Sequence, residues 1–135
     1  MNFENQKNLI EILKKLCQKE SDILFTYLFG SFAYQNNIPE SDIDIAVFLD
    51  EKKSSGFFQR RLDLISNFSQ ALKKEADVII LNNAPLFLKY VILNEGKLII
   101  EKNPSKRIDF ELKTTNEYFD FKPIIVKYEE RILKV

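Results

Sequence analysis

The stretch LFTYLFGSFAYQNNIPESDIDIAV, residues Leu24 to Val47, decides the fold. Its apolar run, Leu24 to Phe29, ends at a Gly-Ser pair and is typical of a strand buried on both faces. The asparagines and the proline between Tyr34 and Ser41 predict a loop. After this loop apolar and polar residues alternate, so we expect a second strand that carries Asp42 and Asp44 on one face.

The composition limits the chemistry that the chain can perform. Its 135 residues, 45% of them hydrophobic, suffice for one domain with a core, and we expect residues 1–135 to form a single domain. Twenty basic residues balance twenty acidic ones, which disfavours a long nucleic acid as a direct partner. Histidine is absent, which excludes histidine-dependent nucleophiles and histidine zinc sites. Carboxylates, hydroxyls, lysines or bound metal ions must therefore do any chemistry.

Three features predict a cytoplasmic protein without a membrane role. The single cysteine, Cys17, cannot form an internal disulfide, and we expect it to pack in the core. The first residues lack the apolar segment of a signal peptide. No apolar run approaches the length of about 20 residues that spans a bilayer.

Hydrophobic periodicity predicts eight elements in the order helix, strand, strand, helix, strand, helix, strand, helix. The fold class is therefore α/β (α+β), and the simplest arrangement is a mixed four-stranded sheet with helices packed mainly on one face. The expected bounds are 5–19 for the first helix, 24–29 and 42 onward for two strands, 57–74 for the second helix, 76–81 for the third strand, 84–95 for a short helix, 97–101 for the fourth strand and 105–135 for a last helical region.

The last region carries two apolar stripes separated by Pro123, which should kink or divide the helix. One stripe suffices to dock the helix on its own sheet, and the second either packs there too or offers an exposed apolar patch. We expect residues 105–135 to contribute to partner binding, with internal packing of both stripes as the alternative. The stripes comprise Ile108, Leu112, Thr115 and Phe119, then Phe121, Ile125, Tyr128 and Ile132.

Asp42 and Asp44 form the first candidate site. Alternate residues of a strand have Cα atoms about 6.5–7 Å apart, close enough for two carboxylates to share cations, and hard oxygen ligands suit Mg²⁺. A solvated strand edge explains an isolated Asp-x-Asp equally well. The preceding Gly30-Ser31 pair favours a phosphate site, because backbone amides at the end of a buried strand can turn toward a phosphate, although Ser31 alone would also fit a helix cap.

Gly30-Ser31, ten intervening residues and then Asp42-Ile43-Asp44 resemble the signature of the DNA polymerase beta-like nucleotidyltransferases. Within that superfamily, the chain is similar over nearly its whole length to the minimal nucleotidyltransferases (MNT proteins), which are commonly paired with HEPN-domain toxins. The resemblance implies the polymerase beta-like fold.

The resemblance also implies site residues. A third carboxylate on a neighbouring strand matches Asp77, with Glu75 at the end of the preceding helix as the competing position. Asp42, Asp44 and Asp77 would then be the catalytic metal ligands for two Mg²⁺ ions, and Gly30 and Ser31 would bind the nucleotide.

One position departs from the pattern of the family. Tyr34-Gln35 stands where many relatives have Arg-Gly, so that a cation for the triphosphate is missing. Arg60, Arg61 or Lys89 would have to compensate.

The resemblance further implies a protein adenylyltransferase antitoxin. It would transfer AMP from ATP to a tyrosine hydroxyl of a HEPN ribonuclease toxin, release pyrophosphate and form an oligomer with that partner. Two alternatives remain open: a non-catalytic antitoxin that neutralises its partner by binding alone, and a small-molecule nucleotidyltransferase.

Overall fold

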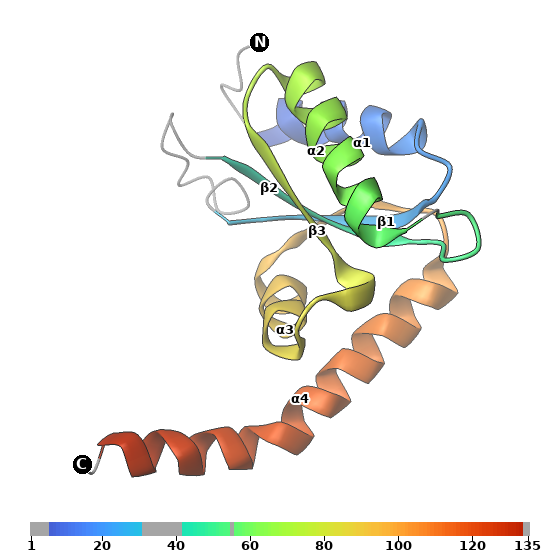
Figure 1. Ribbon diagram of the computed structural model, residues 1–135. Helices are drawn as coiled ribbons and strands as arrows, with labels where there is room; N and C mark the ends of the chain where they lie inside the picture. The colour runs from blue at the N-terminus through green and yellow to red at the C-terminus, as the bar shows by residue number, and fades with distance from the viewer. Residues whose placement is uncertain (1–5, 31–41, 55, 134–135) are drawn as a thin grey trace.

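A computed structural model describes residues 6–30, 42–54 and 56–133, and Figure 1 shows its elements. The predicted order of helices and strands is confirmed. The elements are α1 (Gln6–Gln18), β1 (Ile23–Phe29), β2 (Ile43–Leu49), α2 (Phe57–Leu72), β3 (Ala76–Ile80), the 3₁₀ helix η2 (Leu81–Asn83), α3 (Leu86–Glu95), β4 (Lys97–Glu101) and α4 (Pro104–Leu133).

The four strands form one mixed sheet, as the sequence predicts, in the order β3-β2-β1-β4. β1 runs antiparallel to both β2 and β4, whereas β2 and β3 are parallel. The end of β1 therefore lies beside the beginnings of β2 and β3, with Phe29 opposite Asp44. This corner of the sheet gathers the residues that the sequence marks as functional.

Helices cover both faces of the sheet, which corrects the expectation that they pack mainly on one face. α1 and α2 lie on one face, and α3 with the first half of α4 lies on the other (Figure 1). β1 and β2 supply apolar side chains to both faces, so a second helical layer can be buried. The first core includes Leu13, Cys17, Ile43, Ile45, Val47, Leu64 and Phe68; the second includes Phe25, Tyr27, Ala46, Leu81, Ile92 and Phe110.

β2 is buried on both faces except at its beginning. Ile43 and Ile45 pack against α1 and α2, while Ala46 and Phe48 face α3 and α4. Full burial of each large aliphatic side chain contributes about 1.5–3 kcal/mol. By alternation, Asp44 points to the face of Ala46 and Phe48, where the apolar layer stops short of it.

α4 is a single helix of 30 residues with Pro123 inside it. It bends but does not divide (Figure 1), as expected where proline removes one backbone donor. Phe110 and Thr114 are buried and dock the helix, whereas the predicted first stripe is largely exposed, including Ile108 and Leu112. Among the described residues, no helix is both long enough and apolar enough to cross a membrane.

Candidate active site

Asp44 and Asp77 are register partners on the parallel strands β2 and β3. Neighbouring strands lie about 4.8 Å apart, so the two carboxylates project from adjacent positions on the face covered by α3 and α4. Asp42 precedes β2 and is exposed. Its charge contributes to the electrostatic environment of Asp44, two residues along the chain.

The surroundings of Asp44 raise the pKa of its carboxyl above the usual aspartate value. Partial burial is the largest cause, followed by the charge of Asp77 and then that of Asp42. A negative charge on Asp44 is therefore costly in the absence of a counterion. A bound cation would remove this cost, and an all-oxygen donor set suits a hard cation such as Mg²⁺.

Gly30 has a conformation that favours glycine, with φ of 73°. A Cβ atom at this position would overlap Oδ2 of Asp44. Glycine therefore allows the chain to leave β1 directly beside the carboxylate. Ser31, the predicted second nucleotide-binding residue, lies outside the described residues, as does Tyr34-Gln35.

Arg61 of α2 reaches the third carboxylate around the outer edge of β3. Its Nη2 donates a hydrogen bond to Oδ1 of Asp77 at 3.0 Å, and its Nε donates to the carbonyl oxygen of Val78 at 2.6 Å. Among the described residues, no three acidic or cysteine side chains are arranged to hold a metal ion as they stand. Asp77 is instead paired with Arg61, a partnership that the sequence does not reveal.

The other two candidate cations have different surroundings. Arg60 forms ion pairs of 2.6 Å with both Glu20 and Asp22. Asp22 precedes β1, at the end of that strand opposite Gly30, so Arg60 joins α2 to the α1–β1 turn rather than serving the site. Lys89 lies on α3, over the face that carries the carboxylates. Of these three candidates, Arg61 is the one that, among the described residues, contacts the carboxylate cluster of Asp42, Asp44 and Asp77, through its hydrogen bond to Asp77.

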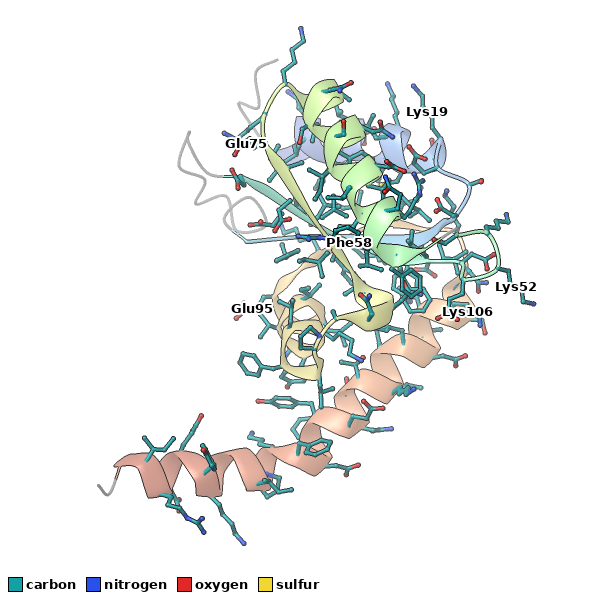
Figure 2. The ribbon with its side chains drawn as sticks, viewed as in Figure 1. Lys19, Lys52, Phe58, Glu75, Glu95 and Lys106 are labelled. Carbon is teal, nitrogen blue, oxygen red and sulfur yellow. The ribbon has the colours of Figure 1, made fainter. Side chains whose placement is uncertain are left out.

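A cavity of about 450 Å³ opens beside the cluster and is bordered by Asp42 and Asp77. Its other walls combine polar side chains, among them Ser66 and Glu75, with the apolar side chains of Ile65 and Ala76. Glu75, labelled in Figure 2, is exposed, whereas Asp77 is half-buried beside Asp44. This difference favours Asp77 over Glu75 as the third functional carboxylate.

The family model for "Polymerase beta, Nucleotidyltransferase" matches residues 11–105, more than half of the chain and all of the carboxylate cluster. The chain belongs to this nucleotidyltransferase family. No significant match was found among curated proteins.

Solved structures share the fold of this nucleotidyltransferase over nearly its whole length. A toxin–antitoxin crystal structure with AMP-PNP has a chain with a TM-score of 0.75 and 22% identity, covering 96% of this chain and 98% of that one. A structure of the tri-AMPylated HEPN toxin from Shewanella oneidensis in complex with MNT antitoxin matches with a TM-score of 0.74 and 22% identity. The match covers 96% of this chain and 99% of that one. A crystal structure of the toxin–antitoxin MntA-HepT matches with a TM-score of 0.69 and 21% identity, over 98% of this chain and 99% of that one. The described fold thus matches that of chains from toxin–antitoxin complexes.

Proposed function

We propose that this nucleotidyltransferase is the MNT antitoxin of a HEPN toxin and transfers AMP from ATP to a tyrosine hydroxyl of that toxin. The observation that carries the proposal is the register pair Asp44 and Asp77, held beside the glycine that ends β1. The tri-AMPylated toxin in the structurally similar complex supports this choice of acceptor.

The reaction joins an acceptor oxygen to the α-phosphorus of ATP and breaks its bond to the bridging oxygen, so that pyrophosphate leaves. Asp42 and Asp44 would ligate two Mg²⁺ ions, and Asp77 would ligate one of them. Bound Mg²⁺ would neutralise charge on the attacking and leaving oxygens. Asp77, at the acceptor side, would take the hydroxyl proton. Gly30, and Ser31 by its place in the motif, would bind the triphosphate through closely approaching backbone.

One oxygen of Asp77 would exchange its partner when the carboxylate ligates a metal ion. This oxygen, Oδ1, accepts a hydrogen bond from Arg61. The ion pair is partly solvated, with both side chains about 40% exposed, and such pairs contribute about 0–1 kcal/mol. Exchange of Arg61 for a metal ion therefore has a small cost, and it frees a guanidinium beside the triphosphate site, in place of the missing Arg-Gly cation.

We further propose that the distal segment of α4, residues 119–133, binds the toxin. Figure 2 shows this segment extending away from the sheet, with side chains on both sides of the helix. Six large apolar side chains of this segment are exposed, and apolar exposure concentrated in one segment marks an interaction site. These side chains belong to Phe119, Phe121, Ile124, Val126, Tyr128 and Ile132.

A non-catalytic antitoxin is the second candidate function. The pairing of Asp77 with Arg61 favours it, because the guanidinium already supplies positive charge to this carboxylate and so weakens its need for a metal ion. Such a protein would keep the fold and the distal segment and would neutralise the toxin by covering it.

Incubation of the purified chain with the HEPN toxin, ATP and Mg²⁺ separates the two functions. Intact-mass measurement should show a toxin heavier by one or more adenylyl groups, and tryptic mapping should place each group on a tyrosine. Asp44→Asn and a chelator serve as controls and should leave the mass unchanged. A toxin that is inhibited at unchanged mass would establish the binding-only function instead.

A further inference from the structure

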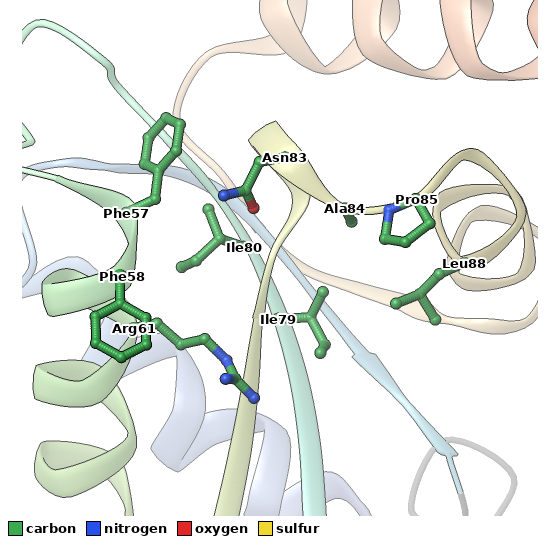
Figure 3. Close-up of a pocket in the computed structure, with 9 residues that line it drawn as sticks. All are labelled: Phe57, Phe58, Arg61, Ile79, Ile80, Asn83, Ala84, Pro85 and Leu88. Atoms are coloured by element: carbon green, nitrogen blue, oxygen red, sulfur yellow. The ribbon is translucent and has the colours of Figure 1, made fainter.

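A second cavity, of about 300 Å³, lies at the outer edge of β3 and is not part of the carboxylate cluster. In Figure 3, Phe58 and Arg61 of α2 lie on one side of β3, Pro85 and Leu88 lie on the other, and Asn83 lies at the end of the strand. Ile79 of β3 forms part of the floor. Three separate chain segments thus contribute to one recess.

The lining has the chemistry of a site for a flat heteroaromatic ring. Phe58, Pro85 and Leu88 offer apolar surface, while Arg61 and Asn83 add a few hydrogen-bonding groups. Small-molecule sites are typically apolar with a few polar groups and begin at volumes of about 300 Å³. Phe58 is 74% exposed, so its ring face is open to a ligand.

The cavity is connected to the carboxylates through Arg61, which lines it and also pairs with Asp77. Ile79 follows Asp77 by two residues on the same strand face, a separation of about 6.5–7 Å between Cα atoms. In a nucleotide, the ribose separates base and α-phosphate by a comparable span. A tyrosine ring, bonded directly to its reacting oxygen, could not fill this cavity with that oxygen at Asp77.

We propose that this cavity binds the base of the nucleoside triphosphate, with Phe58 stacking on the ring and Asn83 contacting its polar edge. The inference rests on the proposed nucleotidyl transfer, because it assigns the base of that reaction's donor substrate. Arg61 then lies between base and carboxylates, beside the phosphates.

Binding of Mg²⁺-ATP and of Mg²⁺-tripolyphosphate, measured by titration calorimetry, tests the assignment because tripolyphosphate lacks the base. Ala84, which lines the cavity in an extended conformation open to any side chain, can be enlarged by Ala84→Phe to fill it. Phe58→Ala removes the stacking ring. Phe87→Ala is the matched control, because Phe87 is an exposed phenylalanine that does not line the cavity. Melting temperatures verify that each variant is folded.

We expect the wild type and Phe87→Ala to bind ATP more tightly than tripolyphosphate. Phe58→Ala and Ala84→Phe should weaken ATP binding by about tenfold, the scale of one base–aromatic stack, and leave tripolyphosphate binding unchanged. ATP binding that is unaffected in both folded variants but lost in Asp44→Asn would overturn the cavity assignment and leave the proposed function standing. Failure of the wild type to bind either ligand would overturn both.

Discussion

Arg61 and Asp77 form an ion pair, 3.0 Å between Nη2 and Oδ1, across the outer edge of β3. The same guanidinium donates to the carbonyl oxygen of Val78, which anchors it at the strand. We therefore expect Arg61 and a metal ion to compete for the carboxylate of Asp77.

Arg61→Gln should bind Mg²⁺ more tightly than the wild type, by up to about fivefold, because a partly exposed ion pair contributes at most about 1 kcal/mol. Calorimetric titration with MgCl₂ alone measures the change. Lys113→Gln makes the same change of charge on exposed α4, where Lys113 forms a long ion pair of 4.0 Å with Glu117, and should have no effect. Unchanged or weaker Mg²⁺ binding in Arg61→Gln would show that the pair supports the site rather than competing for it.

Asp44→Asn should abolish nucleotide transfer and raise stability at neutral pH. The pKa of Asp44 is raised in the folded state, so the folded wild type binds its proton more strongly than the unfolded chain does. Wild-type stability therefore decreases as pH rises from the ordinary aspartate pKa of about 3.9 through the higher folded value. Asparagine has no such titration.

Urea unfolding of both proteins between pH 3 and pH 8 measures this difference. The advantage of Asp44→Asn should appear above the folded pKa of Asp44 and vanish below pH 3.9. A variant less stable than the wild type at pH 7 would mean that the carboxylate is a structural acceptor, and full transfer activity would refute its role as a metal ligand.

Mg²⁺ together with a non-hydrolysable ATP analogue should raise the melting temperature. When the free ligand concentration is a hundred times Kd, a ligand that binds only the folded state raises the free energy of unfolding by about 2.7 kcal/mol. For a domain of this size, that corresponds to roughly 10 °C. Differential scanning fluorimetry with analogue and Mg²⁺ added separately and together provides the measurement. A flat response at millimolar concentrations of both would favour the binding-only antitoxin.

Phe121→Ser and Tyr128→Ser should abolish toxin binding and leave the melting temperature unchanged. The two side chains are 52% and 65% exposed, and exposed substitutions usually change stability by less than about 0.5 kcal/mol. Phe110→Ser on the same helix is the contrasting variant, because Phe110 packs in the core. The free energy of unfolding of Phe110→Ser should be about 3–5 kcal/mol lower than that of the wild type. Toxin capture and thermal melts of all three variants give the comparison, and retained toxin binding by both distal variants would exclude the interface.

Asp22→Asn should destabilise the fold at neutral pH. Burial by itself would raise the pKa of Asp22, but its hydrogen bonds and charge pairing with Arg60 outweigh burial and lower it. The stabilisation is thus present above the unfolded pKa of about 3.9 and is lost as pH falls through the lower folded value. Breaking one partner of such a pair costs about 3 kcal/mol at pH 7. A difference between variant and wild type that persists undiminished at pH 2 would contradict an electrostatic origin.

Periodicity in the sequence was sufficient to predict the four strands. The alternation after Asp42 predicts which face each β2 side chain takes. The place of Asp77 at the start of a strand selects it over Glu75, which ends the preceding predicted helix. Both predictions depend on the spacing of residues along a single helix or strand, which the sequence shows directly. The family model over residues 11–105 agrees with the resemblance seen in the motif.

The remaining features depend on contacts between distant segments. Arg61 reaches Asp77 only because β3 is an edge strand, and no local pattern marks a strand as an edge. The docking face of α4 contains Phe110 and Thr114 rather than the stripe of Ile108 and Leu112, since the approach angle of the helix selects the buried side. The cavity beside Phe58 likewise arises where α2, β3 and the start of α3 meet.

The stacked rings of Tyr90 and Tyr118, with centroids 3.6 Å apart, tie α4 to α3 just before the distal segment leaves the domain. A partner bound to that segment would stay tethered within reach of the carboxylates, since fifteen helical residues extend only about 22 Å. Tethering replaces bulk concentration by an effective concentration of the acceptor, typically millimolar for a short link. Successive transfers to one partner molecule would then proceed without its release, at a rate independent of how much partner the solution contains.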